Sequence, residues 1–136
     1  MNKDWPQTIN EMQQKFGTHE SVAKMSPALL KEFLKFRISC LQEEMIEIEH
    51  ALENKDPEEI IDGIIDWCVF GIGTLDCYGV DAHKAWTAVL NANLAKNVGV
   101  KADRPNPFGL PDLIKPEGWQ PPSHAGNHGK LTEALQ

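Results

Sequence analysis

The sequence feature that most constrains the fold is an apolar stretch from Ile60 to Leu75 that is interrupted by two acids, Asp62 and Asp66. No other charged residue occurs in this stretch. An ionised carboxylate that is buried without a partner costs several kcal/mol, or its pKa shifts until it is neutral. Each aspartate therefore needs a basic side chain or a metal ion, unless it lies on a solvated face.

The spacing of apolar residues and helix breakers predicts an all-α chain. The expected helices cover residues 8–16, 27–53 after a Ser26 cap, 57–78 after an Asp56 cap, and about 82–96 after an Asp81 cap. The turn at 54–57 is short, so the second and third helices form a long antiparallel hairpin. The abundance of Pro, Gly and charge from 99 to 122 predicts irregular structure without strands.

The length of 136 residues predicts one domain over 1–122, followed by a flexible C-terminal tail over 123–136. A net charge of -7 disfavours binding to nucleic acid or to anionic membranes. The three cysteines lack a Cys-x-x-Cys spacing, which favours buried thiols in a reducing compartment. Without a signal core or an uninterrupted apolar span, we expect a cytoplasmic protein.

Four carboxylates of the expected hairpin lie at matching heights. Glu44 and Glu47 share one stripe of the long helix, and Asp62 and Asp66 share one stripe of the next. Glu44 and Asp66 are each eleven residues from Lys55 at the tip, and Glu47 and Asp62 are eight and seven residues away. Facing carboxylates repel unless hard cations neutralise them, and oxygen-only ligands select Mg²⁺ or Mn²⁺ over Zn²⁺. Salt-bridged or solvated acids are the alternative.

A di-iron bundle is a second interpretation of the same acids. Glu47-Ile-Glu-His50 supplies one Glu-x-x-His element, and such a site needs two. No second element exists, because Glu does not occur three residues before any of the other histidines, His19, His83, His124 and His128. We therefore expect His50 to be an exposed residue near the hairpin tip.

Several motifs between about residues 37 and 122 resemble those of the MazG-like all-α nucleoside triphosphate pyrophosphohydrolases, especially short phage and bacterial members. Relatives include dimeric dUTPases and phosphoribosyl-ATP pyrophosphohydrolase. The motifs are Arg37, Glu43-Glu44-x-x-Glu47, Asp62-x-x-x-Asp66, Gly73-Thr74, Gly79-Val80, Asn93-Leu-Ala-Lys96 and Lys115-Pro-Glu-Gly-Trp-Gln-Pro-Pro122. Many members carry Glu-x-x-Asp on the third helix, where this chain has Gly63 three residues before Asp66. Either Asp62 replaces the missing Glu, or Glu59-Ile-Ile-Asp62 is the motif.

The resemblance implies a four-helix MazG-like bundle that forms a homodimer or homotetramer. It implies that two or three Mg²⁺ or Mn²⁺ ions are held by Glu44, Glu47, Asp62 and Asp66. Glu43, or the neighbouring Glu44, would orient and deprotonate the attacking water. The expected phosphate contacts are Lys96 and Asn93, assisted by Arg37, Arg104 and Lys115. The competing interpretations are an ion pair with an acid of a neighbouring helix for Arg37 and a solvated helix end for Lys96.

Four tryptophans are candidates for stacking on a base. Trp67 lies in the densest apolar stretch and is expected in the core, whereas Trp119 and Trp5 are more open to a base-binding role. The chain has no Gly-x-x-x-x-Gly-Lys-Ser/Thr phosphate loop, so phosphate binding is expected to depend on metal.

The expected activity is hydrolysis of a nucleoside triphosphate to its monophosphate and pyrophosphate, in control of the nucleotide pool. The resemblance to phage-type members leans towards a purine such as dGTP or GTP, in a host cytoplasm if the chain is phage-encoded. dUTP, dCTP or a phosphoribosyl nucleotide are alternative substrates. A non-catalytic helical oligomerisation module is the alternative of a different class.

Overall fold

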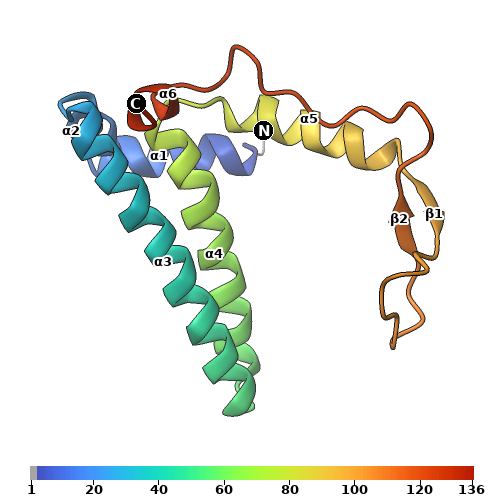
Figure 1. Ribbon diagram of the computed structural model, residues 1–136. Coiled ribbons are helices and arrows are strands. Elements are labelled where there is room, and N and C mark those ends of the chain that lie inside the picture. The colour runs from blue at the N-terminus through green and yellow to red at the C-terminus, as the bar shows by residue number, and fades with distance from the viewer. Residues whose placement is uncertain (1–2) are drawn as a thin grey trace. The chain divides into compact units, whose positions relative to one another are not determined.

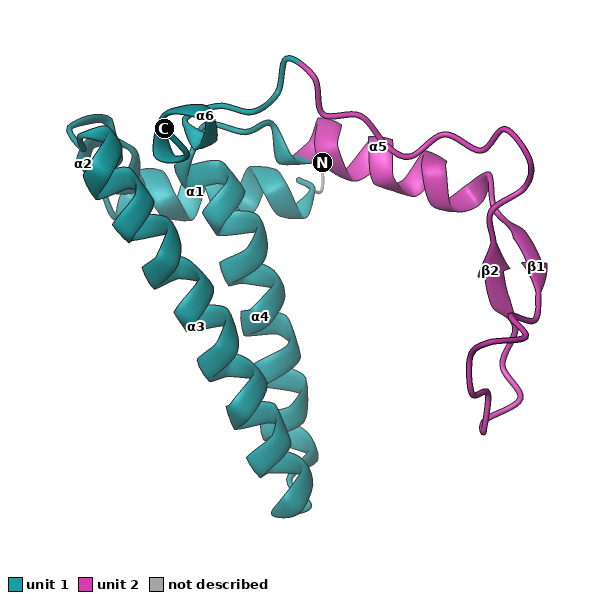
Figure 2. Ribbon diagram, viewed as in Figure 1, with its two compact units in different colours: residues 1–82, 126–136 teal, residues 83–125 magenta. Residues whose placement is uncertain are grey.

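A computed structural model describes residues 3–136, and these residues form two compact units. Unit 1 contains the residues up to 82 together with 126–136, and unit 2 contains residues 83–125 (Figure 2). The described residues form six helices and two short strands, which confirms the all-α class. Among these residues, no helix combines the length and apolar content that a membrane crossing requires.

The long hairpin of unit 1 consists of α3 (Pro27–Glu53) and α4 (Pro57–Cys77), which lie side by side in Figure 1. Each helix begins with a proline after a side-chain cap, Ser26 for α3 and Asp56 for α4. The helices approach closely at Gly63, where an added Cβ would lie 2.6 Å from Ile48 Cγ1. The hairpin and its bounds therefore follow the sequence expectation to within one residue.

Two helices precede the hairpin, and only one of them was expected. α1 (Trp5–Lys15) begins earlier than the expected residue 8, because Asp4 and Gln7 form a capping box there. α2 (Thr18–Ala23) follows Gly17, whose φ of 69° ends the first helix. α1 packs on α4 through buried Gln13, which donates hydrogen bonds to the Gly73 carbonyl and to Cys77 Sγ.

The core of unit 1 lies at the end of the hairpin that is remote from the 54–56 turn. It is a cluster of six buried residues, Val22, Leu30, Cys77, Tyr78, Val80 and Ala134. Tyr78 has no exposed surface, and its hydroxyl donates a hydrogen bond to the Leu30 carbonyl. This contact joins the end of α4 to the beginning of α3.

The C-terminal residues contribute to this core, although the sequence predicted a flexible tail over 123–136. Residues 126–136 belong to unit 1, and α6 (Leu131–Ala134) buries Ala134 to 1% exposure. Buried Asn127 accepts a hydrogen bond from the Asp81 amide and donates one to the Asp81 carbonyl. Lys130 N–H donates to the Tyr78 carbonyl at 2.7 Å. In all three hydrogen bonds the partner on the other segment is a backbone group, which apolar periodicity does not reveal.

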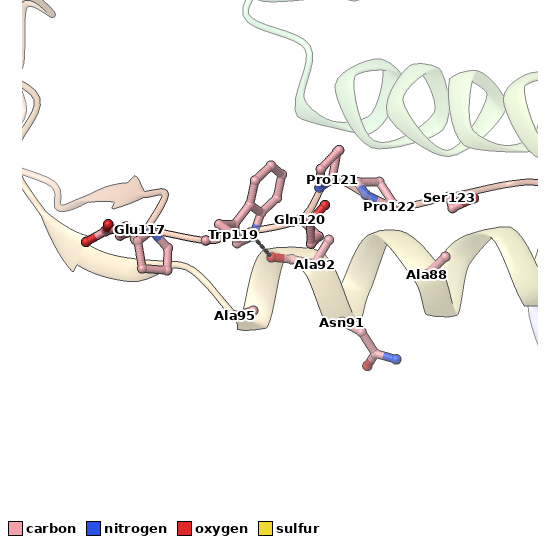
Figure 3. Close-up of a pocket in the computed structure, with 12 residues that line it drawn as sticks. Ala88, Asn91, Ala92, Ala95, Glu117, Trp119, Gln120, Pro121, Pro122 and Ser123 are labelled. Carbon is pink, nitrogen blue, oxygen red and sulfur yellow. Dashed lines mark hydrogen bonds between the residues drawn. The ribbon is translucent and has the colours of Figure 1, made fainter.

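Unit 2 contains most of α5 (Ala82–Leu94) and an antiparallel pair of strands, β1 (Asn97–Gly99) and β2 (Asp112–Ile114). Val98 pairs with Leu113 in this two-stranded sheet. The sequence predicted neither strand, since each has only three residues and shows no useful alternation. After β2 the chain returns along α5, where Trp119 Nε1 donates to the Ala92 carbonyl at 2.8 Å (Figure 3).

Candidate metal centre

The carboxyl group of Glu44 is the most unusual acidic group of the hairpin. Its Oε2 atom is buried and has no hydrogen-bond partner within the described residues. Burial raises the pKa of Glu44 above its ordinary value, and the negative charges of Glu47 and Asp66 raise it further. The charge of Glu43 acts in the same direction. Glu44 thus sits among acids with one carboxyl oxygen unsatisfied by the described residues.

Two of the other predicted metal ligands, Glu47 and Asp66, are close enough to Glu44 to act on its charge. Asp66 on α4 acts electrostatically on Glu44 on α3, as their equal distance from the turn predicted. Glu47 lies one helical turn from Glu44, towards the hairpin tip, and shares the same cluster of charge. Asp62 is an exposed residue of α4, one turn from Asp66. Its part in the cluster stays a prediction.

The donor set of this cluster fits a hard cation. All of its ligand atoms are carboxylate oxygens, and one of them is buried without a partner. Over residues 3–136, no three His, Cys, Asp or Glu side chains already converge in a metal-ligand arrangement. Mutually repelling carboxylates have no electrostatic reason to converge without a counter-charge. Mg²⁺ or Mn²⁺ would supply that charge.

Arg37 lies in the interface between α3 and α4, farther from the hairpin tip than the acids. Its Nε donates to Thr74 Oγ1 at 3.0 Å, and its Nη2 donates to the Phe70 carbonyl at 3.2 Å. Its guanidinium carbon is 4.9 Å from the centroid of the Phe70 ring. An added Cβ at Gly73 would lie 3.0 Å from Nη2, so the glycine leaves room for the arginine. The partners of Arg37 in the structure are neutral groups rather than the acid considered in the sequence analysis.

In unit 2, two predicted phosphate ligands and a predicted base-binding residue lie together. The Nζ atoms of Lys96 and Lys115 are 5.2 and 5.0 Å from the centroid of the Trp119 ring. The other two cationic or polar candidates of this unit lie elsewhere on it. Asn93 is an exposed residue of α5, and Arg104 Nη1 is 3.6 Å from Asp112 Oδ1 in the strand region. Trp5, the other base-binding candidate, is an exposed residue of unit 1.

An open groove of about 560 Å³ lies beside Trp119, between α5 and the returning segment 116–123 (Figure 3). Ala88 and Ala92 of α5, together with Ala95 just after the helix, form one side of it. The other side includes Pro121 and Pro122. Sequence reasoning did not find this groove, although two alanines spaced by four residues on one helix face, Ala88 and Ala92, were an available signal.

A second hollow of about 420 Å³ lies in unit 1, lined by α1 and the end of α4. Its polar residues include Asp76, which accepts a hydrogen bond from Asn10 Nδ2 at 2.8 Å. His19 Nε2 lies 2.7 Å from the other oxygen of Asp76. The sequence analysis did not single out this network, because its members are far apart in the chain and belong to no recognisable motif.

Comparison of the chain with family models, with curated proteins and with solved structures gives no match. The resemblance to MazG-like pyrophosphohydrolases therefore rests on the motifs of the chain itself.

Proposed function

We propose that this protein is a divalent-metal-dependent nucleoside triphosphate pyrophosphohydrolase. The observation that carries the proposal is the buried, unpartnered Oε2 of Glu44 among Glu47, Asp66 and Glu43. An acidic cluster of this kind destabilises a fold unless a cation occupies it. The motif resemblance adds the reaction class, which is hydrolysis between the α- and β-phosphates.

The acids of the hairpin divide into two roles in this proposal. Glu44, Glu47, Asp62 and Asp66 would hold Mg²⁺ or Mn²⁺. A bound ion of this kind neutralises phosphate charge and lowers the pKa of water. Glu43 is an exposed neighbour of Glu44 on α3, so its carboxylate is free of the burial that affects Glu44. Glu43 would orient a water and accept its proton as the water oxygen attacks the α-phosphorus and the bond to the pyrophosphate leaving group breaks.

The proposal includes a homodimer or homotetramer. Large apolar side chains of the hairpin are solvent-exposed in the single chain, including Met45 and Ile46 on α3 and Ile61, Ile64 and Ile65 on α4. Each of these five is about half exposed or more. Exposed apolar surface of this kind on a two-helix hairpin is typical of a face that a second hairpin covers.

The test is pyrophosphate release from a panel of canonical NTPs and dNTPs with Mg²⁺ or Mn²⁺. The wild type should release pyrophosphate, and dGTP and GTP are the expected preferred substrates of the panel. Glu44→Gln and Asp66→Asn should lose at least a hundredfold in rate, since each removes one anionic ligand while nearly preserving shape. Glu49→Gln is the matched control, because Glu49 is an exposed acid of the same helix outside the cluster.

Metal-dependent release that survives in Glu49→Gln and is lost in the other two variants would support the proposal. Equal activity in all four proteins would refute the assignment of the carboxylates. No release from any nucleotide, together with no effect of metal on stability, would favour the non-catalytic oligomerisation module instead.

A further inference from the structure

The contacts around Trp119 do not suit a residue that stacks on a base. Its indole N–H is already bound to the Ala92 carbonyl, which fixes the ring against α5. Two lysine ammoniums, from Lys96 and Lys115, lie over the same ring. A ring that faces two cations attracts them through its π electrons, so it holds positive charge in place.

The two ammoniums lack anionic partners in unit 2. Their distances to the ring centroid put them within about 10 Å of each other. Within residues 3–136 neither forms an ion pair, and the side chain of Glu117, the acid nearest to them in sequence, points away from Trp119 in Figure 3. Two gathered like charges repel each other, so an anion that bridges them would be bound favourably.

The groove beside the ring provides space for the rest of a ligand. Its volume of about 560 Å³ is in the range of small-molecule sites. Its walls are small and mostly apolar, with alanines on α5 and prolines on the returning segment. A flat, weakly polar ring system fits such walls. Lys96 and Lys115 are not part of the lining, but they follow Ala95 and precede Pro116, which are, so a polyanion attached to the ring system could reach them.

We propose that Trp119 is a positioning residue that holds Lys96 and Lys115 as a clip for the polyphosphate of a nucleotide, whose base and sugar occupy the groove between α5 and residues 116–123. The identification of the ligand as a nucleotide rests on the proposed function. This assignment moves Trp119 from the base-stacking role expected from the sequence to the support of the phosphate ligands. It also assigns base contact to the groove.

Binding is tested on the full chain in EDTA, so that no divalent ion at the metal centre contributes to it. The probes are tripolyphosphate, which has no base, and an α,β-methylene dGTP, which cannot be hydrolysed at the α-phosphate. Lys96→Gln and Lys115→Gln should each lower the affinity for both probes about tenfold or more, because each removes a charge-assisted hydrogen bond. Lys101→Gln, a unit 2 lysine outside the clip, is the matched control and should change neither by more than about twofold.

Two further variants separate the clip from the groove and from simple misfolding. Trp119→Leu removes the ring and should lower the affinity for tripolyphosphate about tenfold. Lys96→Arg keeps the positive charge and the contact with the ring, so it should retain most of the affinity that is lost in Lys96→Gln. Ala88→Leu fills the groove without loss of helix propensity. This variant should lower the affinity for the dGTP analogue and leave the affinity for tripolyphosphate unchanged.

Equal affinity of wild type, Lys96→Gln and Lys115→Gln for tripolyphosphate would overturn the clip, as would an equal loss in Lys101→Gln. The failure of the proposed function is a separate result. If the clip variants lose binding in EDTA but no protein releases pyrophosphate with metal, the proposed hydrolase activity is refuted and the proposed anion site is supported. If pyrophosphate release is intact and the variants bind normally, only the clip is refuted.

Discussion

The substitution Glu44→Gln should change stability in opposite directions with and without a divalent metal ion. Burial raises the pKa of Glu44 above its ordinary value of 4.5, and neighbouring Glu47 and Asp66 add to the effect. A carboxyl whose pKa is raised in the fold binds its proton more tightly there than in the unfolded chain. The metal-free fold therefore loses stability as the pH rises from about 4.5 through the raised pKa. Glutamine carries no charge, so in EDTA at pH 7.5 the variant should melt at a higher temperature than the wild type.

The magnitude of the metal effect follows from binding linkage. An ion at a hundred times its Kd stabilises the fold by about 2.7 kcal/mol per site. With about 2.1 cal/mol/K of unfolding entropy per residue, a chain of 136 residues gains about 9 °C in Tm. If loss of the Glu44 carboxylate weakens metal binding a hundredfold, the same metal concentration stabilises the fold by only about 0.4 kcal/mol, which raises Tm by about 1 to 2 °C. The order of the two melting temperatures should thus invert when metal is added.

Differential scanning calorimetry of the wild type and Glu44→Gln measures this inversion, in EDTA and in MgCl₂ or MnCl₂ at matched ionic strength. Glu49→Gln controls for the loss of one surface charge from α3 and should follow the wild type in both conditions. The metal-linked gain of the wild type should also grow as the pH rises above about 4.5, since the ion competes with the proton on Glu44. An equal gain in wild type and Glu44→Gln would refute the reasoning, and so would a wild type that does not respond to metal.

Three further outcomes are expected. Gly129→Ala should cost about 3 kcal/mol or more in urea unfolding, because its φ of 54° disfavours a side chain and an added Cβ would lie 2.1 Å from the Tyr78 carbonyl oxygen. Gly126→Ala has a φ of 77° with open space around it and should cost only about 1 to 2 kcal/mol, so equal costs would contradict a steric role for Gly129. Asn127→Ala should cost about 1 to 3 kcal/mol in the same assay, since it removes two hydrogen bonds of a buried side chain, and a neutral result would show that these bonds do not stabilise the fold. Ile64→Lys places a charge on the exposed face of α4 and should lower the oligomeric state in sedimentation velocity, whereas an unchanged state would move the subunit interface elsewhere.

The sequence by itself determined the parts of this protein that depend on neighbours along the chain. The hairpin of α3 and α4 was predictable because its caps, Ser26 and Asp56, bind backbone amides only three residues away. The joint placement of Glu44 and Asp66 was predictable for a related reason. A regular rise per residue converts equal distances from a short turn into equal height across the hairpin.

Only the tertiary structure decided which distant segments meet. The C-terminal residues close on Tyr78 and Asp81 through backbone groups and one amide, which have no sequence signature. Lys96 and Lys115 come to one indole ring because a two-stranded turn and a proline-rich return bring the chain back along α5. The physical reason is the range of the interactions. Helix hydrogen bonds and caps are satisfied within a few residues, whereas these contacts depend on how the chain folds back, and spacing along the sequence does not specify that path.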